Sequence, residues 1–313
     1  MKYIKSADFH LDNTAVALGK FEGIHRGHQL LLDEIIKQKK NGLQSVVFTF
    51  DMPPGSVLKG ERDYQQIYTK EERYQILKGQ NIDVLIEHPF TRDFASLEPE
   101  AFVREVLIEK TGAKAVVVGT DFRFGRKRSG DIYVLKKLSE TYDFQLIVID
   151  KLQIGHEDVS STRIRGLLEK GEMEAVCELL GRPYSVVSPV VHGKALGRTI
   201  QIPTVNQLVE HEKLVPPNGV YISRIHAEGK TFYGITNIGV KPTVEEHAVK
   251  GIETNIFDFD KDIYGQTIEV ELLHYHRPEM CFSSVDKLRN QMMEDISFAK
   301  DFIQQFAGEG TEN

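Results

Sequence analysis

The chain has 313 residues, of which 41% are hydrophobic and 27% charged, and it carries a formal net charge of -7. This length and composition predict two folded domains with ample core. The negative charge argues against a general nucleic-acid binder, whose affinity comes from many Lys and Arg contacts to phosphate.

The cysteines and the start of the chain exclude further classes. Cys177 and Cys281 are the only two cysteines and form no Cys-x-x-Cys pair, so we expect neither a zinc site nor a disulfide framework but two buried, reduced thiols. Charged residues interrupt the first twelve positions, and no later apolar run approaches membrane-spanning length. The expected location is therefore the cytoplasm, without a membrane partner.

Residues 1–182 alternate short apolar runs with helical segments. The helices expected between these runs include 70–78 and 99–110. Fully apolar strands separated by helices are typical of a parallel sheet covered on both faces, an α/β fold. The expected strands are 14–18, 45–50, 84–86, 115–119 and 145–149.

The turn after the first strand reads Gly19-Lys20-Phe21-Glu22-Gly23-Ile24-His25-Arg26-Gly27-His28. His25 and His28 are three residues apart and share one face if the next helix begins near them. A helix N-terminus offers unpaired N–H groups and the positive end of its dipole, which favour phosphate, and the glycines let a ligand approach the backbone. A lone His or Gly more often serves only as a helix cap or as part of a turn. This combination, however, predicts a site for a nucleotide triphosphate beyond the carboxyl ends of the strands.

Two later segments of the first half carry related chemistry. The hydroxyls of Ser161 and Thr162 precede a helix and are followed by Arg163 and Arg165. Hydroxyls there usually only cap the helix, but two guanidinium forks beside them favour phosphate binding. The segment 119–130 runs from a strand into a basic loop, which supports this prediction although basic clusters are commonly solvated.

After residue 182 the chain changes to short runs rich in Val, Ile, Thr and Tyr with glycines between them. Runs 221–226 and 231–235 flank Glu228-Gly229 and predict a hairpin. Runs 252–259 and 268–275 predict a second hairpin, and several antiparallel strands of this kind indicate a small barrel.

The chain ends with a predicted helix. Ser283 is its expected cap, with Asp286 three residues further on. An apolar stripe from Val285 to Phe306 is expected to pack on the core. Residues 308–313 are expected to be disordered.

Three polar residues of the second half could carry chemistry. Thr204 and Asn206 are two apart after Pro203, so in an extended segment their oxygens can point together toward a metal–phosphate group. Glu253 lies in an alternating run where it could face the barrel interior or rim and accept a hydroxyl proton during phosphoryl transfer. Ordinary turn and surface roles are common for all three, and the sequence alone leaves that alternative open.

In the order of its motifs, residues 14–306 of the chain resemble the bacterial bifunctional riboflavin kinase/FMN adenylyltransferase family. The resemblance implies a Rossmann-like nucleotidyltransferase domain over 1–182 and a flavokinase β-barrel with a C-terminal helix over 183–307. The first would join FMN to AMP from ATP, giving FAD, and the second would phosphorylate riboflavin, with Mg²⁺ serving both. The motifs that carry it are His25-Arg26-Gly27-His28, 119–125, 161–165, 203–206, 237–243 and 253–259.

The resemblance also implies roles for single residues. His25 and His28 would bind the ATP phosphates, and Glu253 would be the base for the ribityl hydroxyl. Ser161, Thr162, Arg163 and Arg165 would hold the triphosphate and the leaving pyrophosphate, and Thr204 and Asn206 the magnesium and phosphates of the second ATP. The remaining positions expected to bind ATP or phosphate are Gly19, Phe21, Gly23, Gly27, Asp121, Gly193 and Gly197.

The chain departs from the family pattern at several of these places. Lys20 and Glu22 stand where the family usually has Asn and Asp, Gln201 replaces a glycine beside the proposed phosphate loop, and Lys241 replaces an arginine. These departures keep two alternatives open: an enzyme with a degenerate kinase domain and a non-catalytic flavin-binding sensor or carrier. A third alternative is a nucleotidyltransferase for another phosphorylated acceptor, because the His-x-Gly-His turn recognises nucleotide phosphates and says little about the acceptor.

Overall fold

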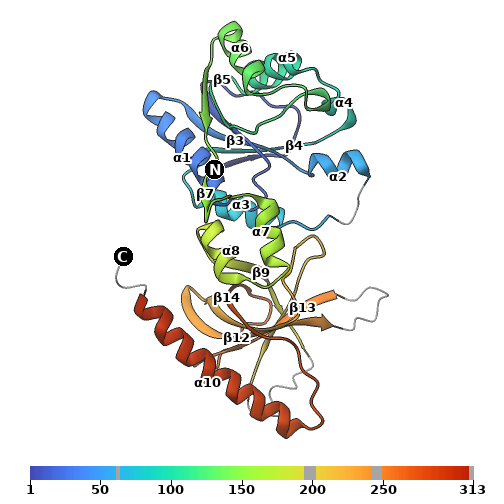
Figure 1. Ribbon diagram of the computed structural model, residues 1–313, viewed down its shortest axis with the longest axis vertical. Helices are drawn as coiled ribbons and strands as arrows, with labels where there is room; N and C mark the ends of the chain where they lie inside the picture. The colour runs from blue at the N-terminus through green and yellow to red at the C-terminus, as the bar shows by residue number, and fades with distance from the viewer. Residues whose placement is uncertain (61–63, 194–201, 242–248, 310–313) are drawn as a thin grey trace. The chain divides into compact units, whose positions relative to one another are not determined.

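The computed structural model describes residues 1–60, 64–193, 202–241 and 249–309 (Figure 1). The chain forms two compact units, Met1–Ser161 and Thr162–Asn313. Each unit has its own secondary structure and core, and the contacts given below lie within one unit.

The first unit contains a six-stranded sheet in the order β1-β4-β3-β2-β5-β6, and every pair in it is parallel. The expected α/β fold is therefore confirmed. β1 and the small β7–β8 pair were not anticipated. Its strands are β1 (Lys2–Ile4), β2 (Thr14–Leu18), β3 (Gln44–Phe50), β4 (Val84–His88), β5 (Ala113–Gly119), β6 (Gln145–Ile149), β7 (Gln153–Ile154) and β8 (Glu157–Asp158).

The helices of the first unit connect these parallel strands. The segment expected as one helix over 99–110 begins as a short α-helix and continues as a π-helix. The helices are α1 (Arg26–Lys37), η1 (Gln38–Asn41), α2 (Pro54–Lys59), α3 (Lys70–Lys78), α4 (Arg92–Ala95), α5 (Pro99–Ala101), η2 (Phe102–Lys110), η3 (Arg126–Arg128) and α6 (Ile132–Tyr142).

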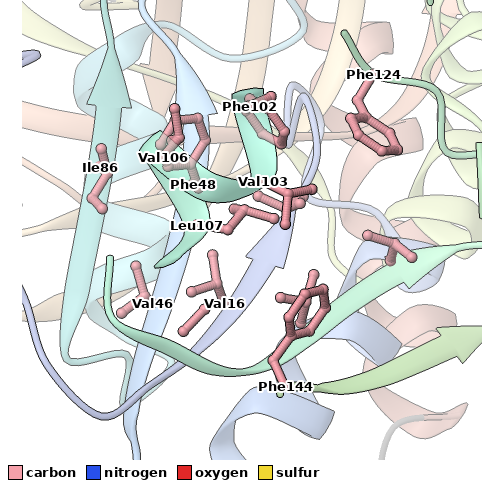
Figure 2. Close-up of a cluster of buried hydrophobic side chains, with 14 of the residues drawn as sticks. Val16, Val46, Phe48, Ile86, Phe102, Val103, Val106, Leu107, Phe124 and Phe144 are labelled. Atoms are coloured by element: carbon pink, nitrogen blue, oxygen red, sulfur yellow. The ribbon is translucent and has the colours of Figure 1, made fainter. Parts of the chain in front are cut away.

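Both faces of the sheet are buried, as expected of apolar strands whose side chains alternate in direction. On one face Val16, Val46 and Ile86 pack with η2 and α6 (Figure 2). On the other face Ala15, Val47 and neighbouring side chains pack against α1 and α3.

The second unit contains a closed antiparallel barrel in the order β10-β13-β12-β11-β14-β9. Inside it Gln207 Nε2 donates to the carbonyls of Ser188 at 2.7 Å and Ile268 at 3.2 Å. Apart from Ser161, which ends the first unit, the elements of the second unit are α7 (Ser161–Leu168), α8 (Met173–Leu180), β9 (Tyr184–Val191), β10 (Val205–Leu208), β11 (Gly219–Ala227), β12 (Lys230–Lys241), β13 (Val249–Ile256), β14 (Thr267–Arg277) and α10 (Val285–Glu309).

One of the two expected hairpins is present and the other is wrong. β11 and β12 meet at the two-residue turn Glu228-Gly229, whose φ angles of 49° and 72° suit a hairpin turn. β13 does not pair with β14, because β13 lies between β10 and β12 while β14 lies between β11 and β9. The segment between them is thus a crossover to the other side of β11.

The C-terminal helix α10 packs on the outside of the barrel. Ala299 is fully buried against Val220, Ile222 and Ile235. The cap is Ser284 rather than the expected Ser283, since Ser284 Oγ accepts the backbone N–H of Lys287 at 3.3 Å. The expected stripe holds over the later turns, but Val285 is 56% exposed at the helix start. α10 continues to Glu309, so the expected disordered tail begins too early at 308, and 310–313 lie outside the described residues.

Candidate functional site

The edge of the sheet at the ends of β2 and β5 collects the first group of candidate residues. The chain runs from β2 outward through β3 to β4 and then returns to β5 on the opposite side of β2. Such a reversal in a parallel sheet opens a crevice beyond the carboxyl ends of the two strands, where ligands commonly bind. The segments that leave these ends are the turn 19–28 and the loop that contains Asp121.

His25 and His28 lie together at the start of α1, as the spacing predicts. His25 is the N-cap, and its Nδ1 accepts the backbone N–H of His28 at 3.2 Å. The proton of the neutral His25 ring therefore sits on Nε2. The two rings stack with centroids 3.7 Å apart. The N–H groups of Arg26 and Gly27 have no carbonyl within the helix to bond, so this end favours an anion.

The glycines and Phe21 shape this turn. A Cβ on Gly27 would come within 3.2 Å of the His25 ring, so glycine lets the imidazole lie against the helix backbone. The Phe21 side chain is fully buried and its ring centroid lies 4.9 Å from that of His28. Phe21 thus packs against His28 inside the turn, and its buried side chain is not accessible to a ligand. Gly23 is buried as well, and Gly19 is half-buried.

Two residues of the turn hold the backbone in the left-handed region: φ is 45° at Phe21 and 45° at Ile24. Bulky side chains are rarely found there, and such strain persists only where the surroundings impose it. The Thr49 hydroxyl donates to the Lys20 carbonyl at 2.9 Å, and the Gly19 N–H donates to the Phe48 carbonyl at 3.3 Å. These bonds fasten the first part of the turn to β3.

A small recess opens beside this turn near the end of β3. Its volume is about 20 Å³, room for about one water molecule, and its lining combines Phe50, Met52 and two prolines with polar side chains. Arg73 is one of these polar residues, is 5% exposed and forms a buried ion pair with Glu87. The full lining is Lys20, Glu22, Thr49, Phe50, Met52, Pro53, Pro54, Gln66 and Arg73.

Glu87 is held by a second partner, the Tyr3 hydroxyl, which donates to its Oε2 at 2.7 Å. Burial, together with that carboxylate, raises the pKa of Tyr3 above its ordinary value. Arg73 and Glu87 are not among the site residues expected from the sequence. The available signal was Glu87 directly after the apolar run Val84-Leu85-Ile86.

Asp121 follows β5 and its side chain is 68% exposed. Its carboxylate lies 3.3 Å from Lys151 Nζ, which also pairs with Asp158 at 3.0 Å. The hydrogen bond to Asp158 raises the pKa of Lys151. In the basic loop that follows, Arg126 pairs with Glu98 at 3.1 Å, which favours the solvated-surface interpretation of that cluster.

The helix α7 begins at Ser161, the last residue of the first unit, and Thr162, Arg163 and Arg165 follow in its first turns at the start of the second unit. Ile164 and Leu168 are the buried residues of this helix. Arg163 and Arg165 are half-buried and Thr162 is exposed. Their expected role toward the nucleotide therefore stays a prediction.

The barrel brings the second group of candidates into one row. Asn206 in β10 lies directly opposite Glu253 in β13, and Glu253 lies opposite Asn237 in β12. Cross-strand partners share one face of a sheet, so the three side chains are neighbours. Asn237 is the member of this row that sequence reasoning missed as a site residue, because strand register cannot be read from local spacing.

This row lies on the outer face of the barrel. Ile235, two residues before Asn237 on the same strand, packs against Ala299 of α10 outside the barrel. Thr236, between Ile235 and Asn237, points into the barrel, and so does its cross-strand partner Thr254. Both residues are fully buried, and their hydroxyl oxygens are 2.9 Å apart. Glu253 is half-buried and faces outward, so the interior alternative is wrong.

The segment before β10 is fastened beside this row. Asn255 Nδ2 donates to the Pro203 carbonyl at 2.7 Å, next to Thr204. Gly193 lies against Asn206, since a Cβ there would be 2.3 Å from its Nδ2. Thr204 and Asn206 carry hard, neutral oxygens, which suit Mg²⁺ that is bound mainly through phosphates. Among the described residues, no cluster of three or more His, Cys, Asp or Glu could hold a metal by itself.

Some positions named from the sequence lie outside what the structure describes: Gly197, Gln201, residues 242–243 of the motif 237–243, and the side chains of Lys241 and Phe306. The expectation of two buried thiols is wrong. Both cysteines are free, but Cys177 is only half-buried and Cys281 is exposed.

Two family models match consecutive parts of the chain. Residues 8–163 match the model described as FAD synthetase, and residues 180–303 match the one described as riboflavin kinase. Across the described residues no helix combines the length and apolar character needed to cross a membrane.

Relatives match nearly the whole chain. A protein of Buchnera aphidicola subsp. Schizaphis graminum named bifunctional riboflavin kinase/FMN adenylyltransferase is 36% identical, covering 93% of this chain and 94% of its own. A protein of the same name from Listeria monocytogenes is 35% identical, covering 93% of each. A Streptococcus pneumoniae crystal structure described as a macrolide-efflux protein is 32% identical, with a TM-score of 0.84 over 94% of this chain and 96% of that one.

Proposed function

The chain belongs to the bifunctional riboflavin kinase/FMN adenylyltransferase family, and from this premise we propose that it converts riboflavin to FMN and FMN to FAD, each step at its own site. It is a transferase with both domains of the family. We place the domain boundary at residue 182, just before β9 begins at Tyr184. The cytoplasm is the proposed location, because both reactions consume ATP.

Adenylyl transfer is assigned to the turn 19–28. A phosphate oxygen of FMN attacks the α-phosphorus of ATP, the bond from that phosphorus to the bridging oxygen breaks, and pyrophosphate leaves. No covalent nucleophile is needed, so the protein orients the reactants and stabilises developing negative charge. His25, His28 and the N–H groups at the start of α1 are suited to the triphosphate. Arg163 and Arg165 would receive the leaving pyrophosphate.

Phosphorylation of riboflavin is assigned to the row on the outer face of the barrel. The ribityl hydroxyl oxygen attacks the γ-phosphorus of ATP, its proton passes to Glu253, and ADP leaves. Asn206 and Thr204 are the residues that would hold Mg²⁺ together with the ATP phosphates. When bound, the ion would neutralise charge on those phosphates.

The observation that carries this proposal is that two family models, one described as FAD synthetase and the other as riboflavin kinase, match consecutive parts of one chain. The test supplies riboflavin or FMN separately with Mg²⁺ and ATP and separates the products by chromatography. We expect His28→Ala to lower FAD formation from FMN by about 10²–10³-fold and to leave FMN formation unchanged. Glu253→Gln should do the reverse, by about 10²–10⁴-fold.

The same assay separates the alternatives. FMN consumed while riboflavin is untouched would identify a degenerate kinase domain. Flavin bound with no product in either reaction would identify a sensor or carrier. If either substitution abolished both activities in a folded protein, the assignment of two separate sites would be wrong.

A further inference from the structure

Glu279 follows β14 and joins two asparagine side chains on the barrel. Asn237 Nδ2 donates to its Oε1 at 3.4 Å, and Asn218 Nδ2 donates to its Oε2 at 3.0 Å. Asn237 belongs to the row with Asn206 and Glu253 to which we assign riboflavin phosphorylation, and Asn218 directly precedes β11. One carboxylate thus connects the segment after β14 to the edge of the proposed kinase site.

Two glycines leave room for this segment on the outer face of the barrel. A Cβ on Gly239, two residues after Asn237 on the same strand, would lie 2.4 Å from Glu279 Oε1 and would displace the carboxylate. A Cβ on Gly219 would lie 2.5 Å from the carbonyl oxygen of Arg277. The place of the Glu279 carboxylate therefore depends on a close approach to the backbone of two strands.

The contact with Glu279 fixes which end of the Asn237 amide faces the row. An ionised carboxylate only accepts hydrogen bonds, so it must meet the NH₂ group and not the carbonyl oxygen. The last torsion of an Asn side chain is roughly two-fold, so the amide can turn over when this partner is lost. Asn218 marks the β11 side of β12, and β13 lies on the other side. We infer that the carbonyl oxygen of Asn237 is directed toward Glu253 in β13.

The orientation of this amide matters to a reaction in which Glu253 receives a proton. A carbonyl oxygen beside Glu253 can accept a hydroxyl of the substrate and cannot donate to the base. An amide turned over would donate its N–H to the Glu253 carboxylate and compete there with the proton of the attacking hydroxyl. The ribityl chain carries hydroxyls on adjacent carbons, so a second one can meet an acceptor next to the base.

We propose that Glu279 is a positioning residue of the kinase site: it holds the amide of Asn237 with its carbonyl oxygen toward Glu253, where that oxygen accepts the ribityl hydroxyl next to the one that is phosphorylated. This inference rests on the proposed function. It deepens that function by naming the group that recognises the polyol chain of the acceptor.

The test is a double-mutant cycle on kcat/KM for riboflavin. We expect Glu279→Ala to lower this constant about fivefold and Asn237→Ala to lower it about tenfold. The double variant should be no worse than Asn237→Ala alone, because Glu279 acts through Asn237. KM for ATP should stay within about twofold of wild type, and FAD formation from FMN should be unchanged, since neither involves this amide.

The matched control is Glu294→Ala. Glu294 is an exposed acid of α10, and its side chain forms no hydrogen bond or ion pair with the described part of the chain. Its kinase constants should equal those of wild type. Glu279→Gln keeps the shape but leaves one oxygen for two amides, so it should cost about twofold and serves if Glu279→Ala fails to fold.

A second measurement uses a riboflavin analogue that lacks the hydroxyl next to the phosphorylated one. The wild type should turn over this analogue about fivefold less efficiently than riboflavin. In Glu279→Ala the two substrates should be equal within about twofold, because the acceptor for that hydroxyl is no longer held. A merely structural role would lower both rates together and leave their ratio unchanged.

A folded Glu279→Ala with the wild-type kcat/KM for riboflavin would overturn the proposal. So would additive losses in the double variant, or full discrimination against the analogue in Glu279→Ala. A wild-type chain that makes no FMN would refute the proposed function and this inference together, whereas an active wild type with an insensitive Glu279→Ala refutes only the inference.

Discussion

Replacing Gly193 by alanine should slow riboflavin phosphorylation about 10²-fold and leave adenylyl transfer intact. The added Cβ would lie 2.3 Å from Asn206 Nδ2 and 2.5 Å from Asn206 Cγ. Asn206 is 5% exposed, and its strand is hydrogen-bonded to β9 on one side and β13 on the other. The backbone at Gly193 is not left-handed, so the substitution acts through this contact alone.

The size of the effect follows from the overlap. Nonbonded heavy atoms of this kind rest at about 3.5 Å, so the Asn206 amide must move by roughly 1 Å. A displacement of that size in a group that positions the reactants costs about 10²-fold in rate. That loss corresponds to about 3 kcal/mol of transition-state stabilisation.

The assay follows FMN formed from riboflavin and, separately, FAD formed from FMN. Gly166→Ala is the matched control, because Gly166 lies in the same unit and nothing lies within 4 Å of the position of its added Cβ. Its kinase rate should equal that of wild type. If Gly193→Ala retained more than half of the kinase rate, the role of Asn206 in holding the phosphates would be refuted. Equal losses in both reactions would instead indicate a folding defect.

Two further predictions concern stability. Arg73→Leu leaves Glu87 buried without its cation and should lower the free energy of unfolding of the first unit by about 3–5 kcal/mol in urea titrations, so a change below about 1 kcal/mol would contradict the pairing. Burial lowers the pKa of His88, so the unfolded chain takes up a proton at this residue that the folded one resists. Stability should therefore fall as the pH drops below about 6.5. His88→Phe should weaken this slope between pH 7.5 and 5, and identical slopes in both proteins would exclude the contribution.

The strands of the first unit were predictable because their signal is local. Runs such as 14–18 and 45–50 are mostly apolar, and burial on both faces of the sheet is the physical reason. β1 carries no such signal, because only Ile4 of its three residues is buried. Glu228-Gly229 was predictable for the same local reason, since a two-residue turn at positive φ favours glycine.

Pairings between distant strands could not be predicted in this way. The run 252–259 followed by 268–275 has the pattern of a hairpin, yet each strand pairs with others whose positions depend on barrel closure. The candidate site residues show the same difference between local and long-range signals. The spacing of His25 and His28 indicated a shared helix end, whereas the neighbourhood of Asn206, Glu253 and Asn237 depends on register across three strands.

Alternate residues along β13 serve different purposes: Glu253 and Asn255 face outward, while Thr254 fills the interior. Inserting or deleting one codon within this strand would exchange the two sets, moving the acid inside and a core residue outside. Such a change would abolish both folding of the barrel and catalysis. We therefore expect this strand to change during evolution by substitution alone. Insertions and deletions should be restricted to the loops that join the strands.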